Sequence, residues 1–358
     1  MRITVHDPQL VLQDLTNFKV AVRSGSAYKP LYVKLKLMWA CNLRCGMCNH
    51  WRDPYTEPMD TGTLKHLIDE LVALGCQKIH ITGGEPTLRP DLEELISYMV
   101  CQGIRPTMTT NGTLLTAERC KSLTEAGLHK VNVSLDSPDP GIHDRLRGSS
   151  GAWSRTIRGI QNLRNYLYRA NSLRLNTVIS KENYLSLTDL PELAHQLRVD
   201  RLNLIPLDRH TEDIEGLSIE EIKEFNRRVA PTIAHLGLRY KLIERRAQAF
   251  PFGDNPQAIA DSSRGHHAHS YYDRHRCYAP WTHCLIDHLG QVSVCCMTTN
   301  QVIMGDLRQQ SFREVWQGEA YTKLRQSHHL PQLQQCRQCD MFLAHNQAIE
   351  GGLGRSRP

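Results

Sequence analysis

The chain of 358 residues is 40% hydrophobic and 22% charged, which provides enough apolar material for a large buried core. Its net charge of +6 comes from 43 basic and 37 acidic residues with interleaved signs, so nucleic-acid binding has no support. The first residues lack the pattern of a signal peptide, and no apolar stretch reaches the roughly 18 residues that span a bilayer. We therefore expect a cytoplasmic protein without a membrane segment.

Short β-branched runs alternate with helix-patterned segments between residues 30 and 207, as in repeated βα units around a parallel sheet. Strands are predicted at 34–40, 78–82, 106–110, 130–136, 173–180 and 201–207. Helices are predicted at 61–74, 91–102, 117–126, 153–170, 187–197 and 218–236. Six units are too few for a closed eightfold barrel. The predicted fold class is therefore α/β, an open, partial (β/α)6 barrel with its chemistry on loops at the carboxyl ends of the strands.

The composition suggests further divisions of the chain. Residues 246–275 are interpreted as a linker because Pro, Gly, Ser and His are frequent there, and cysteines become denser after it. The expected parts are then an N-terminal extension, the partial barrel, the linker, a small C-terminal domain and a disordered tail, over residues 1–29, 30–245, 246–275, 276–345 and 346–358.

Twelve cysteines in a cytoplasmic chain do not indicate disulfides, because that compartment keeps thiols reduced. Cys41, Cys45 and Cys48 follow the first predicted strand on one tight loop. Three thiolates leave one iron of a cubane [4Fe–4S] cluster without a protein ligand, and an open iron can bind another molecule. A zinc site normally pairs two Cys-x2-Cys knuckles, and this loop has no second pair close in sequence.

The segment CNLRCGMC resembles the Cys-x3-Cys-x2-Cys signature of the radical S-adenosylmethionine (SAM) superfamily. The next strand ends in a segment that resembles the family's GGEP motif: Thr82, Gly83, Gly84, Glu85 and Pro86. The resemblance implies that the amino and carboxylate groups of SAM chelate the open iron. Gly83 and Gly84 are expected to allow close backbone approach to this ligand, and Glu85 to accept a hydrogen bond from its ammonium group.

Further positions follow the family's order on the next strand ends. Asn111, in a Thr-Thr-Asn-Gly turn, and Ser134 and Asp136 resemble residues that line the SAM pocket, and Ser134 or Asp136 would hydrogen-bond a ribose hydroxyl. Arg147 resembles a residue that pairs with the SAM carboxylate. The alternative for Ser134 and Asp136 is a helix cap or turn residue.

The position before the third cysteine is a departure from the family pattern. It is often aromatic and packs on the adenine, but here it is Met47. Trp51 is a candidate substitute, and simple packing is the alternative for this residue.

A second group of cysteines lies near the C-terminus, and four of them resemble the cysteine pattern of SPASM and twitch domains: Cys277, Cys295, Cys336 and Cys339. The resemblance implies a small auxiliary iron–sulfur domain with one fully ligated [4Fe–4S] cluster, since no cysteine follows Cys339. A structural zinc on the same cysteines is the alternative. Cys284 and Cys296 would replace a ligand, quench a substrate radical or do nothing. Three others are expected to be packing residues: Cys76, Cys101 and Cys120.

The resemblance implies an oxidoreductase or lyase that takes an electron from a low-potential donor, flavodoxin or ferredoxin, cleaves SAM and abstracts hydrogen from its substrate. The leading hypothesis is maturation of a ribosomally made peptide. Because the first 30 residues are too short for a leader-binding domain, the peptide would need a groove on the barrel or a separate leader-peptide-binding partner protein. The second hypothesis is dehydrogenation or rearrangement of a small molecule such as an aminocyclitol. A nonenzymatic scaffold or electron carrier is the third, and the intact SAM motif argues against it.

Overall fold

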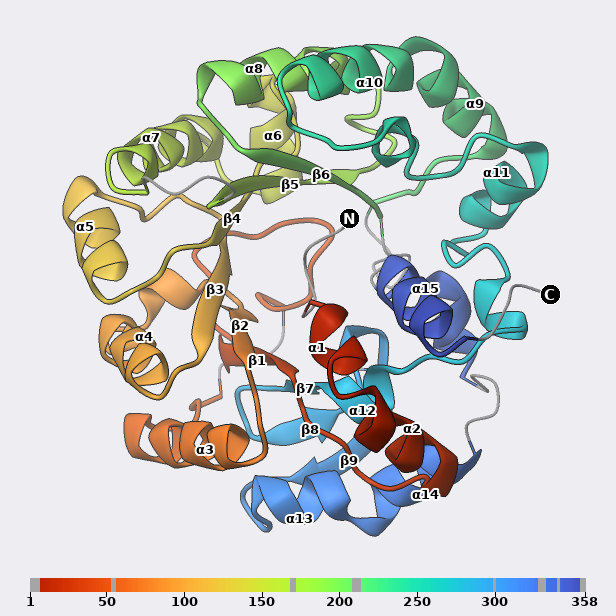
Figure 1. The fold of residues 1–358 in the computed structure, drawn as a ribbon. Helices are drawn as coiled ribbons and strands as arrows, with labels where there is room; N and C mark the ends of the chain where they lie inside the picture. Colours follow the sequence, from red (N-terminus) through yellow and green to blue (C-terminus); the bar gives the residue numbers. More distant parts are fainter. Residues whose placement is uncertain are drawn as a thin grey trace.

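The computed structural model describes residues 7–52, 56–167, 172–207, 214–298, 301–327, 333–339 and 342–354. The strands in these residues form one sheet of nine, in the order β6-β5-β4-β3-β2-β1-β7-β8-β9. Pairing is parallel from β6 to β7 and antiparallel between β7, β8 and β9. The sheet curves into an open arc with helices around its outside (Figure 1). The predicted partial barrel is confirmed.

Repeated βα units build the parallel part of the sheet. Its strands are β1 (Tyr32–Met38), β2 (Lys78–Gly83), β3 (Arg105–Thr110), β4 (Val131–Ser134), β5 (Leu173–Ile179) and β6 (Arg201–Pro206). The helices between them are α3 (Thr61–Ala73), α4 (Leu92–Cys101), α5 (Ala117–Glu125), α6 (Pro140–Arg147), α7 (Ala152–Arg164) and α8 (Leu190–Gln196). Each strand lies where the sequence predicts one. Helix α6 was missed because Leu146 is the one buried apolar side chain among its eight residues.

The predicted helix at 218–236 is two helices, α9 (Ile219–Arg228) and α10 (Ala230–Arg239). Pro231 lies in the first turn of α10 and has no backbone N–H, so one hydrogen bond of a continuous helix cannot form there. The chain therefore turns at Val229, and both helices cover the outer side of β6 (Figure 1).

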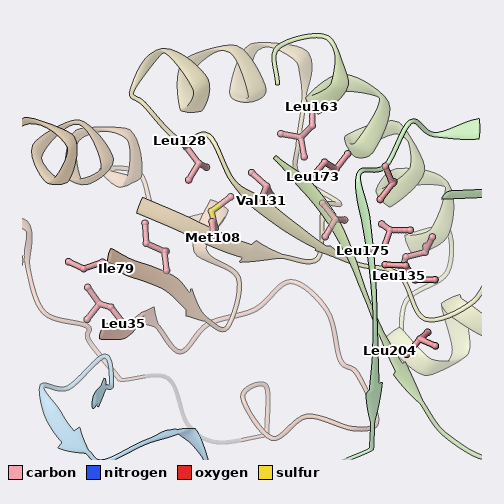
Figure 2. Packing of buried hydrophobic residues seen from close by; sticks show 14 of the residues in the cluster. Leu35, Ile79, Met108, Leu128, Val131, Leu135, Leu163, Leu173, Leu175 and Leu204 are labelled. Atoms are coloured by element: carbon pink, nitrogen blue, oxygen red, sulfur yellow. The ribbon is translucent and has the colours of Figure 1, made fainter. Parts of the chain in front are cut away.

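Strand side chains alternate between the two faces of the sheet. The face toward the helices is apolar, and its residues make up the main core (Figure 2), among them Leu35, Ile79, Met108, Val131, Leu173 and Leu204. The opposite, inner face is polar and hydrogen-bonded across strands. His80 contacts the hydroxyl oxygens of Thr107 and Thr109 at 2.8 and 2.9 Å, and Asn203 donates to Asn176 at 3.1 Å. A polar layer thus lines the inside of the arc.

The C-terminal part continues this sheet. Strand β7 (His283–Ile286) pairs in parallel with β1, with His283 opposite Tyr32, and β8 (Gln291–Ser293) and β9 (Ile303–Asp306) follow. Helices α12 (Ala279–Thr282), α13 (Phe312–Gln317), α14 (Glu319–Ser327) and α15 (Leu343–Gly352) complete it. The predicted domain limits stay predictions, but the sheet itself runs across the limit expected at residue 276.

Two segments differ from the expectation. The expected linker contains helix α11 (Pro256–Ser263), and Phe250, Phe252 and Ile259 lie in the main core. The expected tail is helical to Gly352, where α15 packs beside α1 (Gln9–Leu12) and α2 (Leu15–Ser24) (Figure 1). In both segments the few buried residues are separated by polar ones, so the sequence shows no apolar pattern from which these helices could be predicted. Within the described stretches, no helix has the length and apolar character needed to cross a membrane.

Candidate active site

The first cysteine group lies at the carboxyl end of β1. Cys41, Cys45 and Cys48 share one apolar cluster with Leu43, Met47 and Ala152. All three are free thiols. The structure therefore brings the predicted cluster ligands together on one partly buried loop, beside the ends of β2 and β3.

Backbone hydrogen bonds join the Gly-Gly motif to the end of β1, where this loop begins. The amide N–H of Gly84 donates to the Met38 carbonyl oxygen at 2.9 Å, and that of Glu85 donates to the Ala40 carbonyl oxygen at 2.9 Å. A Cβ at Gly84 would lie 2.0 Å from the Ala40 oxygen. The two glycines thus allow close packing against the end of β1, and their expected approach to a ligand stays a prediction.

The end of α6 holds the loop from the other side, a contact that the sequence did not reveal. Arg44 and Gly46 donate their amide N–H groups to the carbonyl oxygens of Arg147 and Leu146, at 3.2 and 3.1 Å. A Cβ at Gly148 would lie 2.1 Å from the Arg44 oxygen. The glycine after the Leu-Arg pair was the available signal for this close packing.

Two of the thiols lie beside polar donors. Arg147 Nη1 is 3.8 Å from Cys45 Sγ, and Asn111 Nδ2 is 4.0 Å from Cys41 Sγ. Burial raises the pKa of the Cys41 thiol to about 11, and it also raises the pKa of Cys45, where the Arg147 charge opposes it. Buried thiols stay protonated until a metal replaces the proton, after which nearby donors stabilise the thiolate charge.

The third thiol, Cys48, contacts the first of three neighbouring aromatic rings, His50, Trp39 and His288. His50 Nδ1 lies 3.1 Å from Cys48 Sγ, and the His50 ring lies 4.1 Å from the Trp39 ring. Trp39 stacks in turn on His288, at 5.0 Å between ring centroids. Burial lowers the pKa of His50 to about 3, so its ring is neutral near pH 7. This stack joins the cysteine loop to the turn between β7 and β8.

Arg147 and Asp136 form a buried ion pair, with Nη2 and Oδ2 2.7 Å apart. Asp136 is 0% exposed. Burial acts to lower the pKa of Arg147, but attraction to Asp136 outweighs it and the net shift is upward. The roles predicted for these residues, toward the SAM carboxylate and a ribose hydroxyl, stay predictions. Arg147 Nε has no hydrogen-bond partner among the described residues, so the pair need not open for Arg147 to bind a further group.

Glu85 is also fully engaged. Its carboxylate accepts hydrogen bonds from the Thr110 hydroxyl and the Asn111 amide, both at 2.7 Å, and from the Thr87 hydroxyl at 2.6 Å. It is 1% exposed, and burial raises its pKa. Glu85 thus ties the ends of β2 and β3 together, and its predicted contact with an ammonium group remains untested.

The other predicted positions surround the loop. Thr82 is the next-to-last residue of β2 and Ser134 the last of β4, and both are half-buried. Pro86 is buried at the start of a short turn after β2. Met47 packs between two apolar clusters that include Leu43, Leu146 and Leu207. Trp51 donates to the Cys45 carbonyl oxygen at 2.9 Å, so this ring braces the loop.

The second cysteine group gathers at the other end of the inner face, in an apolar cluster with Tyr32 and Phe342: Cys277, Cys295, Cys336 and Cys339. Burial raises the pKa of Cys277, Cys295 and Cys336 to about 12. Asn346 Nδ2 lies 3.5 Å from Cys277 Sγ. One buried and three partly buried thiols in one cluster fit a metal centre that replaces their protons.

The remaining cysteines lie in different environments. Cys284 lies in the main core, on the opposite face of β7 from these ligands, whereas Cys296 is half-buried beside Cys295. Cys76 and Cys120 are buried as predicted, but Cys101 is exposed because it ends α4 on its solvent side. In the part of the chain that the structure describes, no three His, Cys, Asp or Glu side chains form a site for a single metal ion.

Two family models match the chain in this order. The radical SAM superfamily model matches residues 36–194, and the SPASM iron–sulfur cluster-binding domain matches residues 277–340. The chain is a radical SAM enzyme with a C-terminal SPASM domain. This family assignment implies a catalytic [4Fe–4S] cluster, an auxiliary cluster and bound SAM. The two groups of clustered, mostly half-buried thiols fit these cofactors.

Known relatives of this radical SAM enzyme differ in what they do. An AdoMet-dependent heme synthase of Methanosarcina barkeri is 29% identical and covers 83% of this chain and 85% of its own length. A PqqA peptide cyclase of Bradyrhizobium diazoefficiens is 30% identical and covers 49% of this chain and 46% of its own. The structure of Streptococcus suis SuiB bound to S-adenosylmethionine matches with a TM-score of 0.66 at 18% identity, over 96% of this chain and 78% of that one. This structural match supports the fold.

Proposed function

We propose that the enzyme abstracts a hydrogen atom from a small molecule that binds on the inner face of the barrel, between its two cysteine groups. The observation that supports this proposal is the loop of Cys41, Cys45 and Cys48, which backbone hydrogen bonds fix on both sides. Three thiols would hold a cluster with one open iron. With SAM bound there, the reduced cluster supplies a 5′-deoxyadenosyl radical. The protein positions the cofactors and substrate and excludes water.

A small-molecule substrate is favoured by how far the relatives align. Similarity to the heme synthase extends over 83% of the chain, and therefore into the C-terminal domain. Similarity to the peptide cyclase covers 49%, about the extent of the radical SAM domain at residues 36–194. Because all radical SAM enzymes share that domain, the longer alignment carries more information about the substrate.

Peptide maturation is the second candidate, and the peptide cyclase relative favours it. The peptide would bind either through a separate leader-binding partner protein or in a groove on the barrel. Both candidates need a low-potential electron donor such as flavodoxin or ferredoxin, and this partner stays a prediction.

The test measures 5′-deoxyadenosine released by anaerobically reconstituted enzyme under a strong reductant. Replacing Cys41, Cys45 and Cys48 by Ala should abolish release, whereas Cys101→Ala, at an exposed position, should not. Release at the wild-type rate in the triple variant would refute the proposal. One probe is iron coproporphyrin III, the compound in the name of a second Methanosarcina barkeri relative, an Fe-coproporphyrin III synthase that is 34% identical and covers 51% of this chain and 47% of its own length. This compound and a precursor peptide encoded beside the gene are then added separately. Stimulation by the peptide alone would replace the small-molecule proposal by the second candidate.

A further inference from the structure

The charged side chains of strands β1 to β8 are all basic. Strands β1 to β8 contain no Asp or Glu, but six Lys or Arg: Lys34, Lys36, Lys78, Arg105, Arg174 and Arg201. Four of these lie at the first or second residue of their strand, so they mark the amino ends, away from the cysteine loop. Lys34 and Lys36 differ, since they lie in the middle of β1.

These two lysines lie on the inner face of β1, in line with Tyr32. Tyr32 packs in the cluster that contains the auxiliary cysteines, and Cys41 follows the other end of the strand. Lys36 Nζ lies 5.2 Å from the centre of the Trp39 ring, in the stack beside Cys48. Lys34 and Lys36 thus occupy the stretch of the inner face between the two cysteine groups.

The surroundings do not neutralise this pair. Neither ammonium group forms an ion pair with a carboxylate among the described residues. Burial lowers the pKa of Lys36, and the charge of Lys34 lowers it further, while Asp287 acts in the opposite direction. Asp287 Oδ1 already accepts hydrogen bonds from the amides of Leu289 and Gln291, at 2.9 and 2.8 Å. The Cα atoms of the two lysines lie about 7 Å apart along the strand, so their like charges repel on this half-buried face, and an anion between them would reduce the repulsion.

We propose that Lys34 and Lys36 bind a carboxylate of the substrate and fix the substrate between the two clusters. This inference rests on the proposed function, because it assumes that the substrate binds on the inner face. A carboxylate is favoured over a phosphate, since phosphates are usually held by free backbone amides at a helix start or glycine-rich loop. The amides of β1 are used in pairing with β2 and β7.

The test measures equilibrium binding to the anaerobic holoenzyme with SAM present. The probes are iron coproporphyrin III, which carries four carboxylates, and its tetramethyl ester. We expect Lys36→Met to weaken binding of the acid by about tenfold to a hundredfold, the range for one charge-assisted hydrogen bond. Binding of the ester should not change. Lys36→Arg should retain most of the affinity, and Lys34→Met should weaken it in the same way as Lys36→Met.

Lys121→Met is the matched control, because Lys121 is 60% exposed on α5 and pairs only with Glu125. A second arm compares a glutamate-containing peptide with its glutamine counterpart, which distinguishes a peptide carboxylate from that of a small molecule. Wild-type enzyme that binds neither acid would overturn the inference. The inference would also be overturned if Lys36→Met bound the acid as tightly as wild type while the midpoint potential of the catalytic cluster shifted. That result would mean that the lysines only balance the charge of the cluster. Binding is measured apart from SAM cleavage, so failure of the proposed function itself remains distinguishable.

Discussion

The buried pair of Arg147 and Asp136 gives the sharpest structural prediction. Replacing Arg147 by Met leaves the Asp136 carboxylate, which is 0% exposed, without its partner. Breaking such a pair by removing one member costs about 3 to 5 kcal/mol. For 358 residues, an unfolding entropy of about 2.1 cal/mol/K per residue sums to about 0.75 kcal/mol/K. The expected fall in the midpoint of thermal unfolding is therefore about 4 to 7 °C.

The assay is thermal unfolding of the anaerobic holoenzyme, with Arg158→Met on the exposed side of α7 as the control. The double variant with Asp136→Asn should lose less than the sum of the two single losses, because the charges interact directly. A loss for Arg147→Met no larger than for Arg158→Met would refute the buried pair.

The same variants also test the role that the sequence assigns to Arg147. If Arg147 acts through its pair with Asp136, both Arg147→Met and Asp136→Asn should weaken SAM binding, because each loosens the end of α6 that holds the cysteine loop. Direct pairing of Arg147 with the SAM carboxylate predicts instead that only Arg147→Met does so. SAM affinity measured by equilibrium dialysis separates the two outcomes.

Three further results are expected. Burial lowers the pKa of His143 to about 3, so below pH 6.5 the unfolded chain takes up a proton that the folded chain does not. The free energy of unfolding therefore decreases as the pH is lowered. The variant His143→Gln should lose about 1.4 kcal/mol less of this free energy than wild type between pH 7.5 and 5.5, as followed by thermal midpoints. Gly84→Ala should reduce iron incorporation, unlike Gly351→Ala, where an added Cβ meets nothing within 4 Å. Wild-type enzyme should hold about eight irons, and the double variant Cys336→Ala with Cys339→Ala about four, whereas stoichiometric zinc would contradict an auxiliary cluster.

The sequence was informative wherever the cause of the structure is local. Buried parallel strands are short β-branched runs, and the three cysteines of the first loop share one motif, so both could be predicted. Strand β7 could not be predicted, because its four residues pair with β1, which lies some 250 positions earlier in the chain. Its position depends on contacts of Tyr32 and His283 that no local pattern encodes.

Residue roles were less predictable than residue positions. The sequence showed that Gly84, Glu85 and Arg147 belong to motifs, but not which groups surround them. Glu85 accepts hydrogen bonds from three donors of the protein, and Arg147 pairs with a buried carboxylate, and the motifs indicate neither set of partners. The sequence order of a motif gives the neighbourhood of a side chain, whereas its partner depends on the approach of distant segments.

The ring stack connects the C-terminal domain to the catalytic loop, which affects how variants of the auxiliary site are interpreted. His288, in the turn after β7, stacks on Trp39, and its carbonyl oxygen accepts from the Met59 amide at 2.9 Å. The Trp39 ring also contacts the tilted ring of His50, which contacts Cys48. A variant that unfolds this turn would therefore disturb the first cysteine group as well as the second. Loss of SAM cleavage in an auxiliary-cysteine variant indicates an electron-transfer role only if the His288 turn is still folded.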